Sequence, residues 1–207
     1  MLTLILVRHG ETGWNLTGRC QGFSDIELNH TGRKQADEVA KSLEDMTISA
    51  IYSSDLRRAT DTALEIAKYH NLSVEIDPDF REMNQGNFEG LTFVEIRNSY
   101  SHLLSEWKID PESVRIPGGE TLKEVQDRAW RGVRRIMGRH MNGTVVTVSH
   151  NFTIITLLCR FMGIELTNFH TFKIRAASKN VVLIRDGNFR VEIQNDTAHL
   201  SPGLLVS

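Results

Sequence analysis

The sequence predicts an α/β fold: a mostly parallel central sheet of about six strands with helices on both faces, one antiparallel edge strand and a small helical cap. Three observations predict it. Short apolar runs rich in β-branched residues are typical of fully buried strands, segments of helical periodicity alternate with them, and one region fits neither pattern. The length of 207 residues fits a single domain over 1–207.

Two apolar runs are the clearest strand candidates. Residues 2–7 and 144–148 are short, rich in β-branched side chains and bounded by polar residues or glycine. Shorter runs predict further strands at 50–52, 73–76, 180–184 and 189–193. The last two flank Arg185-Asp186-Gly187-Asn188, whose Asp-Gly pair is typical of a hairpin turn. We expect this closing hairpin to add the antiparallel edge.

Helical periodicity is clear in three segments. Apolar stripes run along 36–43, 56–67 and 122–137, and Ser54 is the predicted N-cap of the second helix. A fourth helix is expected after His150. The region 83–119 contains Asn, Gly and Pro punctuation and two short helical patterns. We interpret it as a cap over one end of the sheet, inserted into the single domain.

Charge and cysteine content exclude several classes of protein. The 24 Lys+Arg and 26 Asp+Glu give a net charge of -2, which argues against a polybasic nucleic-acid-binding protein. The two cysteines lie far apart without a CxxC pair, so a disulfide framework is not expected. We therefore expect a cytoplasmic location, where thiols stay reduced. No run approaches the ~18 apolar residues of a membrane helix, and the first apolar run is too short for a signal peptide. Neither nucleic acid nor membrane is therefore an expected partner.

Residues able to do chemistry follow three of the predicted strands. Arg8 and His9 follow the first strand, Arg58 lies just beyond the second, and His150 follows the run 144–148. Ligands of open α/β sheets bind outside the carboxyl ends of the strands. One strand-end histidine alone is usually structural. Two of them with strand-end arginines predict a functional site at this edge.

The composition of this site favours phosphate over a metal ion. Zinc needs three or four His, Cys, Asp or Glu ligands, whereas these histidines have arginine neighbours that repel cations. Guanidinium groups bind planar anions such as phosphate through paired hydrogen bonds. We therefore expect phosphate chemistry without a metal or another cofactor. Phosphoryl transfer also needs a proton donor, and Glu82 and Glu89 follow the third strand, although surface exposure is the usual fate of Glu.

Seven sequence blocks in order resemble the histidine phosphatase superfamily, which has the phosphoglycerate mutase-like fold. The blocks are Arg8-His9-Gly10-Glu11-Thr12, Trp14-Asn15 with Gly18-Arg19-x-Gln21-Gly22, Leu28-Asn29-x-x-Gly32-x-x-Gln35-Ala36, Ser53-Ser54-x-Leu56-x-Arg58-Ala59-x-x-Thr62-Ala63, Glu82-x-x-x-Gly86-x-x-Glu89-Gly90, Gly118-Gly119-Glu120-Thr121 and Val148-Ser149-His150. An Arg-His-Gly triplet alone would be weak evidence. The ordered set is specific and runs over nearly the whole chain, and it is most similar to small metal-independent phosphoserine and broad-specificity phosphatases.

The resemblance implies a catalytic role for five residues. His9 would accept the phosphoryl group and become phosphohistidine. The phosphate oxygens would be bound by Arg8, Arg58 and His150. Glu82 would protonate the leaving alcohol and then take a proton from the attacking water, which requires a raised pKa.

The resemblance also implies a substrate-binding set. Asn15 would donate a hydrogen bond to phosphate, and Gln21 and Gly22 would line its pocket, whereas Glu89 is better interpreted as structural. Asn151 stands where the family commonly has glycine, which narrows the site or changes a backbone contact. His199 in the C-terminal segment either contacts the non-phosphate end of the substrate or caps the last strand. The other histidines are expected on the surface or in the cap: His30, His70, His102, His140 and His170.

The function that follows is a metal-independent phosphomonoesterase acting through phosphohistidine on a small phosphorylated metabolite, with phosphoserine as the best candidate. A phosphoglycerate mutase, an α-ribazole phosphate or sugar phosphate phosphatase, and a non-catalytic phosphate-binding module are the alternatives. Mutases of the family tend to be longer after the acid loop, and this chain is short there. Arg97, Lys108 and Arg115 in the cap are candidate ligands for a second anion but are more typical of solvated charges. A homodimer fits the resemblance and the frequency of twofold oligomers.

Overall fold

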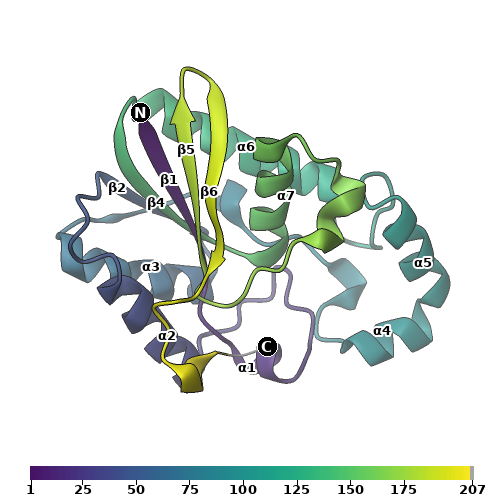
Figure 1. Ribbon diagram of the computed structural model, residues 1–207. Coiled ribbons are helices and arrows are strands. Elements are labelled where there is room, and N and C mark those ends of the chain that lie inside the picture. The colour runs from purple at the N-terminus through teal and green to yellow at the C-terminus, as the bar shows by residue number, and fades with distance from the viewer. Residues whose placement is uncertain (206–207) are drawn as a thin grey trace.

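The computed structural model describes residues 1–205, which form a six-stranded sheet with helices on both faces (Figure 1). The strand order is β3-β2-β4-β1-β5-β6. The strands are β1 (Leu2–Arg8), β2 (Ala50–Ser53), β3 (Val74–Ile76), β4 (Gly143–Ser149), β5 (Lys179–Arg185) and β6 (Asn188–Asp196). All six predicted strands are confirmed, with ends that differ from the predictions by a few residues at most.

The direction of the strands refines the expected antiparallel edge. β1, β2, β3 and β4 pair in parallel, whereas β5 is antiparallel to both β1 and β6. The hairpin therefore lies at the edge as predicted, but its reversed strand is the inner one, and the outermost strand β6 runs in the direction of β1. Asp186 and Gly187 turn the chain with φ of 51° and 78°, the left-handed backbone of a tight hairpin turn.

Two helical layers cover the sheet because β1 alternates apolar side chains between its faces. Ile5 and Val7 pack against α2 (His30–Lys41) and α3 (Arg57–His70). Leu4 and Leu6 pack on the opposite face against α6 (Leu122–Arg139) and α7 (Asn151–Met162). Figure 1 shows the two pairs of helices on either side of the sheet. Among residues 1–205, no helix is long and apolar enough to cross a membrane.

The start of α3 differs from the prediction. Its N-cap is Leu56, which makes no side-chain cap, so the prediction of Ser54 as N-cap was wrong. The backbone N–H of Ser54 instead donates to the Val148 carbonyl at 3.1 Å, which prolongs the pairing of β2 with β4. The helix begins only after the chain has turned away from the sheet, and the Ser54 hydroxyl accepts a hydrogen bond from the Leu56 N–H within that turn.

The predicted cap contains two short helices, α4 (Phe93–Ser99) and α5 (Ser101–Ile109), which lie to one side beyond the end of the sheet (Figure 1). Ile96, Leu104 and Trp107 are buried and belong to the same core as α6 and α7. The cap is thereby packed onto the main body. The remaining short elements are α1 (Gly13–Leu16) and the 3-10 turns η1 (Pro78–Phe80), η2 (Gly86–Phe88), η3 (Leu166–Thr171) and η4 (Pro202–Leu204).

Replacing either of two glycines of α6 by alanine should change the stability of the fold in opposite directions. A Cβ at the buried Gly132 would lie 2.6 Å from Cζ of Phe80, a fully buried ring. We expect Gly132→Ala to lower the free energy of unfolding by about 1–3 kcal/mol, the usual range for overpacking a core. The exposed Gly138 has no atom within 4 Å of such a Cβ, so Gly138→Ala should raise it by about 0.4–1 kcal/mol.

Equilibrium unfolding in urea measures both differences. Gly138→Ala is the matched control because it makes the same chemical change in the same helix. A Gly132→Ala variant as stable as Gly138→Ala would show that the Phe80 ring yields freely. That result would contradict the tight contact between α6 and the segment leading to Glu82.

Candidate active site

The parallel register of the central strands brings two histidines together. Arg8 at the end of β1 lies opposite Ser149 at the end of β4. The next residues along each strand are His9 and His150, whose ring centroids are 5.1 Å apart. Both rings are buried. The predicted convergence of strand-end residues is therefore present in the structure.

The backbone and side chain of His9 are both fixed. Its N–H donates to the Ser149 carbonyl at 3.0 Å, and its carbonyl accepts from the Ala177 N–H at 3.1 Å. Its ring Nδ1 lies 2.7 Å from the Gly10 carbonyl oxygen. This carbonyl can only accept, so Nδ1 carries the proton, and Nε2 of the neutral ring has a free lone pair. Burial lowers the pKa of His9 well below its usual value, and the charges of Arg58 and Arg8 lower it further.

Two arginines reach the site, and backbone carbonyls fix both. Arg8 Nη1 donates to the Ile174 carbonyl at 2.5 Å. Arg58, which is fully buried, donates from Nη1 to the Ser24 carbonyl and from Nη2 to the Gly22 carbonyl, each at 2.8 Å. Burial lowers the pKa of Arg58 to about 10, which leaves it charged at neutral pH. Carbonyls fix a guanidinium without neutralising it, so the positive charge remains available to an anion.

Glu82 is a buried carboxyl group beside these cations. Its Oε1 accepts hydrogen bonds from the backbone N–H groups of Met83 at 2.9 Å and Phe152 at 3.0 Å. Burial raises the pKa of Glu82, and this effect outweighs the hydrogen bond from Met83 and the nearby arginines, which lower it. The raised pKa favours the protonated form that can donate a proton.

His150 completes the site from the start of α7. Within residues 1–205, neither of its ring nitrogens has a hydrogen-bond partner. Burial lowers the pKa of His150 well below its usual value, and the charge of Arg58 adds to this effect. An imidazole surrounded by cations but without a protein partner is suited to donate a hydrogen bond to an anion that neutralises those cations.

The loop after β1 presents Asn15 with a defined orientation. Asn15 Oδ1 accepts from the Thr12 N–H at 3.0 Å, and the Thr12 hydroxyl lies 3.0 Å from Gln21 Oε1. The amide nitrogen of Asn15 is thereby left as the donor that faces the site. Gly22 adopts φ of 51°, and a Cβ there would lie 2.0 Å from Glu89 Oε1. The tight approach at Gly22 explains why this turn needs glycine.

Glu89 is structural, as the sequence indicated. Its carboxylate accepts hydrogen bonds from the N–H groups of Phe23, Ser24 and Gln85 and from the Ser24 hydroxyl. These bonds join the acid loop to the segment that carries the carbonyls of Gly22 and Ser24. The position of Arg58 therefore depends on Glu89.

Most of these groups line a cavity of about 140 Å³, whereas the fully buried His150 is not part of its lining. Its lining includes most of the predicted site residues, namely Arg8, His9, Asn15, Gln21, Gly22, Arg58, Glu82 and Asn151. His199 lines neither this cavity nor the larger one beside it among the described residues. His199 follows the end of β6 by three residues, and its ring Nε2 lies 3.1 Å from the Ala177 carbonyl. This placement fits the strand-capping alternative for His199.

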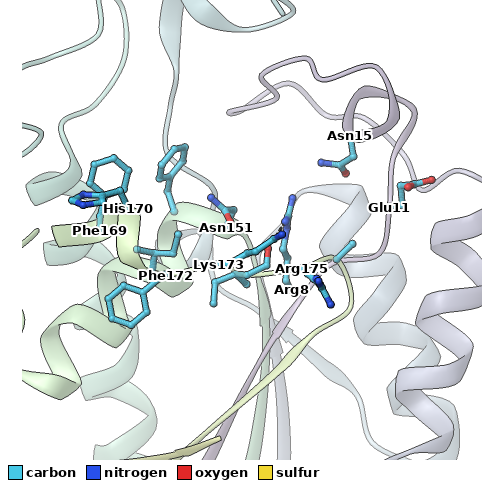
Figure 2. A pocket seen from close by; sticks show the side chains of 13 residues that line it. Arg8, Glu11, Asn15, Asn151, Phe169, His170, Phe172, Lys173 and Arg175 are labelled. Atoms are coloured by element: carbon cyan, nitrogen blue, oxygen red, sulfur yellow. Dashed lines mark hydrogen bonds between the residues drawn. The ribbon is translucent and has the colours of Figure 1, made fainter. Parts of the chain in front are cut away.

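Several residues that line the cavities were not among the predicted site residues. Arg19, Cys20, Gln85 and Phe152 also line the smaller cavity. A larger cavity of about 410 Å³ adjoins it and is lined by Phe169, His170, Phe172, Lys173 and Arg175, among others (Figure 2). These residues lie in η3 and the loop before β5, where no spacing or motif distinguished them. The cap cations considered instead, Arg97, Lys108 and Arg115, line neither cavity among the described residues.

The donor set of the site fits an anion. Among residues 1–205, no group of three or more His, Cys, Asp or Glu side chains is arranged to hold a metal ion. Cys20 also lines the smaller cavity, and burial raises its pKa to about 11, so it is not a reactive thiolate. The other polar side chains of the lining are three guanidinium groups, the His9 imidazole, four amides and the Glu82 carboxyl, a set rich in hydrogen-bond donors for an anion.

Known proteins are similar to this chain in sequence and in fold. The family model of the histidine phosphatase superfamily (branch 1) matches residues 4–197. Phosphoserine phosphatase 1 of Hydrogenobacter thermophilus is 36% identical over 97% of this chain and 95% of its own length. Phosphoglycerate mutase-like protein 4 of Arabidopsis thaliana is 36% identical over 95% of this chain and 86% of its own. The H9A mutant of phosphoserine phosphatase from Entamoeba histolytica, in complex with phosphoserine, is 31% identical with a TM-score of 0.87, covering 97% and 100% of the two chains.

The lowered pKa of the buried His150 should make the free energy of unfolding depend on pH. Burial lowers the pKa of His150 on folding from its ordinary value of 6.5, so the unfolded chain takes up the proton first as the pH falls. Stability from this group is therefore complete above pH 6.5 and is lost in more acidic solution. His150→Asn should remove up to about 1.4 kcal/mol per pH unit from the slope of unfolding free energy against pH.

Urea unfolding between about pH 5 and 8, in buffer without phosphate, measures the two slopes. Glu82, whose pKa is raised on folding, gives a slope of opposite sign in the acidic part of this range, but it is common to both proteins and cancels in their difference. Above about pH 8 the difference should be constant, because the unfolded histidines are then neutral as well. Parallel curves throughout the acidic range would contradict the buried neutral His150.

Proposed function

The chain belongs to the histidine phosphatase superfamily (branch 1) and is a phosphoric monoester hydrolase, and from this premise we propose His9 as its nucleophile and phosphoserine as its substrate. One observation carries the proposal. The ring of His9 is fixed through Nδ1 to the Gly10 carbonyl, which leaves Nε2 as the nucleophilic atom in a cavity that also contains Arg58 and Glu82. A nucleophile, positive charge and a proton donor thus share one small space.

In the first step the phosphate group occupies the smaller cavity. Arg8, Arg58 and Asn15 donate hydrogen bonds to its non-bridging oxygens, and His150 adds another. Nε2 of His9 attacks phosphorus while the bond to the ester oxygen breaks, and the proton of the Glu82 carboxyl moves to that oxygen. The products are phosphohistidine, the free alcohol and the Glu82 carboxylate.

In the second step water hydrolyses phosphohistidine. The Glu82 carboxylate takes a proton from the attacking water, the bond between phosphorus and Nε2 breaks, and inorganic phosphate leaves. Glu82 ends protonated and His9 ends neutral, so both are ready for the next cycle. The low pKa of His9 keeps its lone pair available, and the raised pKa of Glu82 lets one group act first as acid and then as base.

Phosphoserine as substrate is supported by the relatives. One curated relative is named as a phosphoserine phosphatase, and one solved structure of similar fold is in complex with phosphoserine.

A cytoplasmic location and a homodimer stay predictions. The location is supported by Cys20 and Cys159, which are both free thiols, as is usual in a reducing compartment.

Removal of the acid should affect substrates according to their leaving groups. Glu82→Gln is nearly isosteric but cannot supply a proton, so kcat/KM for phosphoserine should fall about 10²- to 10⁴-fold. For p-nitrophenyl phosphate, whose leaving group needs no protonation, the loss should be much smaller. In the unchanged protein, activity on phosphoserine should decline as the pH rises through the raised pKa of Glu82.

Steady-state phosphate release over a pH series measures both effects. Glu89→Gln is the matched comparison in the same loop, because Glu89 supports the loop but does not line the cavity. It should reduce the rates for the two substrates by similar factors. If Glu82→Gln lowered kcat/KM by the same factor for both substrates, Glu82 would not be the general acid.

The reaction itself is tested by comparing two assays. The protein should release phosphate from phosphoserine, retain this activity in EDTA, and convert 3-phosphoglycerate to 2-phosphoglycerate much more slowly. His9→Ala should reduce phosphate release by at least about 10³-fold and abolish the acid-labile phosphoenzyme. Dominant mutase activity would overturn the phosphatase assignment, and full activity of His9→Ala would overturn the mechanism.

A further inference from the structure

The larger cavity opens directly beside the proposed phosphate site. Its lining shares Arg8, Asn15, Asn151 and Phe152 with the smaller cavity, so the two spaces are continuous. A phosphate group bound in the smaller cavity therefore has its ester oxygen and leaving group next to the larger one. With about 410 Å³ against about 140 Å³, the larger cavity has room for the rest of the substrate.

Two cations of the loop between η3 and β5 line this cavity. Lys173 is exposed and Arg175 is half-buried. Among residues 1–205, neither side chain forms an ion pair or a hydrogen bond, and the buried Nε of Arg175 has no partner. The cap cation Arg115, in contrast, is paired with Glu124 and donates to the Gly119 carbonyl. A partly desolvated guanidinium without a partner is costly unless an anion binds to it.

The charges around the cavity are unevenly distributed. Figure 2 shows Arg8, Lys173 and Arg175 close together, with Asn15 and Glu11 across from them. Glu11 is the acidic residue of the lining, and its Oε1 already accepts a hydrogen bond of 2.7 Å from Asn29. An anionic group of a ligand is therefore drawn to the side of the cavity that carries Lys173 and Arg175.

Packed aromatic rings form one side of the cavity. Phe152 and Phe169 each pack edge-on against Trp107, with ring centroids 5.9 and 5.0 Å apart, and Phe169 is 6.2 Å from Phe152. Phe152 and Phe169 form an apolar part of the lining of the larger cavity. The cavity thus fits a carbon chain with an anionic group at each end.

We propose that Lys173 and Arg175 form a subsite for a second anionic group of the substrate, a carboxylate or a second phosphate. This inference rests on the proposed function, because it places the hydrolysed phosphate in the smaller cavity. The two residues bind the far end of the leaving group and select phosphomonoesters that carry another negative charge. They are specificity residues and take no part in the chemical step.

Matched substrate pairs isolate the subsite. Phosphoserine differs from phosphoethanolamine by one carboxylate, and fructose 1,6-bisphosphate differs from fructose 6-phosphate by one phosphate. Arg175→Gln should lower kcat/KM about 10- to 100-fold for the member with two anionic groups in the pair that the protein prefers, mainly through KM. Activity on the partner lacking the second anion should change less than about threefold. Lys173→Gln should act in the same direction but more weakly, because its charge is more exposed.

Arg185→Gln is the matched control, since Arg185 is an exposed arginine at the far end of β5 and should leave all four substrates unaffected. The carboxylate pair and the bisphosphate pair distinguish the two sources of the second anion. Equal losses of Arg175→Gln on both members of each pair, or no loss at all, would overturn the subsite. Failure of the unchanged protein to release phosphate from any of these esters would instead overturn the proposed function.

Discussion

The parallel pairing of β1 with β4 is the constraint on which the site depends. The register of Arg8 with Ser149 leaves His9 and His150 as neighbours where the two strands end. The carbonyl of Ser149 then fixes the backbone of His9, and the Ser149 hydroxyl donates to the Phe80 carbonyl on the segment that leads to Glu82. A shift of one residue in this register would turn the side chains of the shifted strand to the other face of the sheet and would separate His9 from His150.

The guanidinium group of Arg58 is held in the site by backbone carbonyls and not by acidic side chains. Arg58 is fully buried, yet its terminal nitrogens bind the carbonyls of Gly22 and Ser24. A buried ion pair would satisfy the guanidinium but would cancel its field. Carbonyl partners satisfy the N–H groups and leave the charge to act on an anion. Burial is the main cause of the lowered pKa of His9, and the same charge lowers it further, so one arrangement serves both the binding of phosphate and the activation of the nucleophile.

Much of this arrangement could be predicted from the sequence, because each catalytic residue is tied to a strand end or a recognisable block. Arg8, His9 and His150 follow buried strands, and apolar runs are strong local signals. The start of α3 could not be located in this way, because Ser54 has good capping chemistry but its N–H is committed to Val148.

The cavity beside the phosphate site shows the limit of local signals more clearly. Lys173 and Arg175 lie in an irregular loop, and they reach the site only because β5 returns beside β1 and the Ile174 carbonyl accepts a hydrogen bond from Arg8. Their position depends on contacts between segments more than 150 residues apart in the sequence. No periodicity or spacing contains that information. The sequence instead drew attention to the cap cations, which are charged residues of the right type in a segment that packs elsewhere.

The two glutamates of the acid loop show how surroundings divide the roles of identical side chains. The carboxylate of Glu89 accepts four hydrogen bonds from three residues, which hold the acid loop against the segment of Gly22 and Ser24. Glu82 accepts from backbone N–H groups but is buried, and burial is the larger influence on its pKa. The first carboxylate is therefore suited to fixing the loop and the second to exchanging a proton. Since Glu89 also positions the carbonyls that bind Arg58, the structural acid maintains the positive charge beside which the other acid acts.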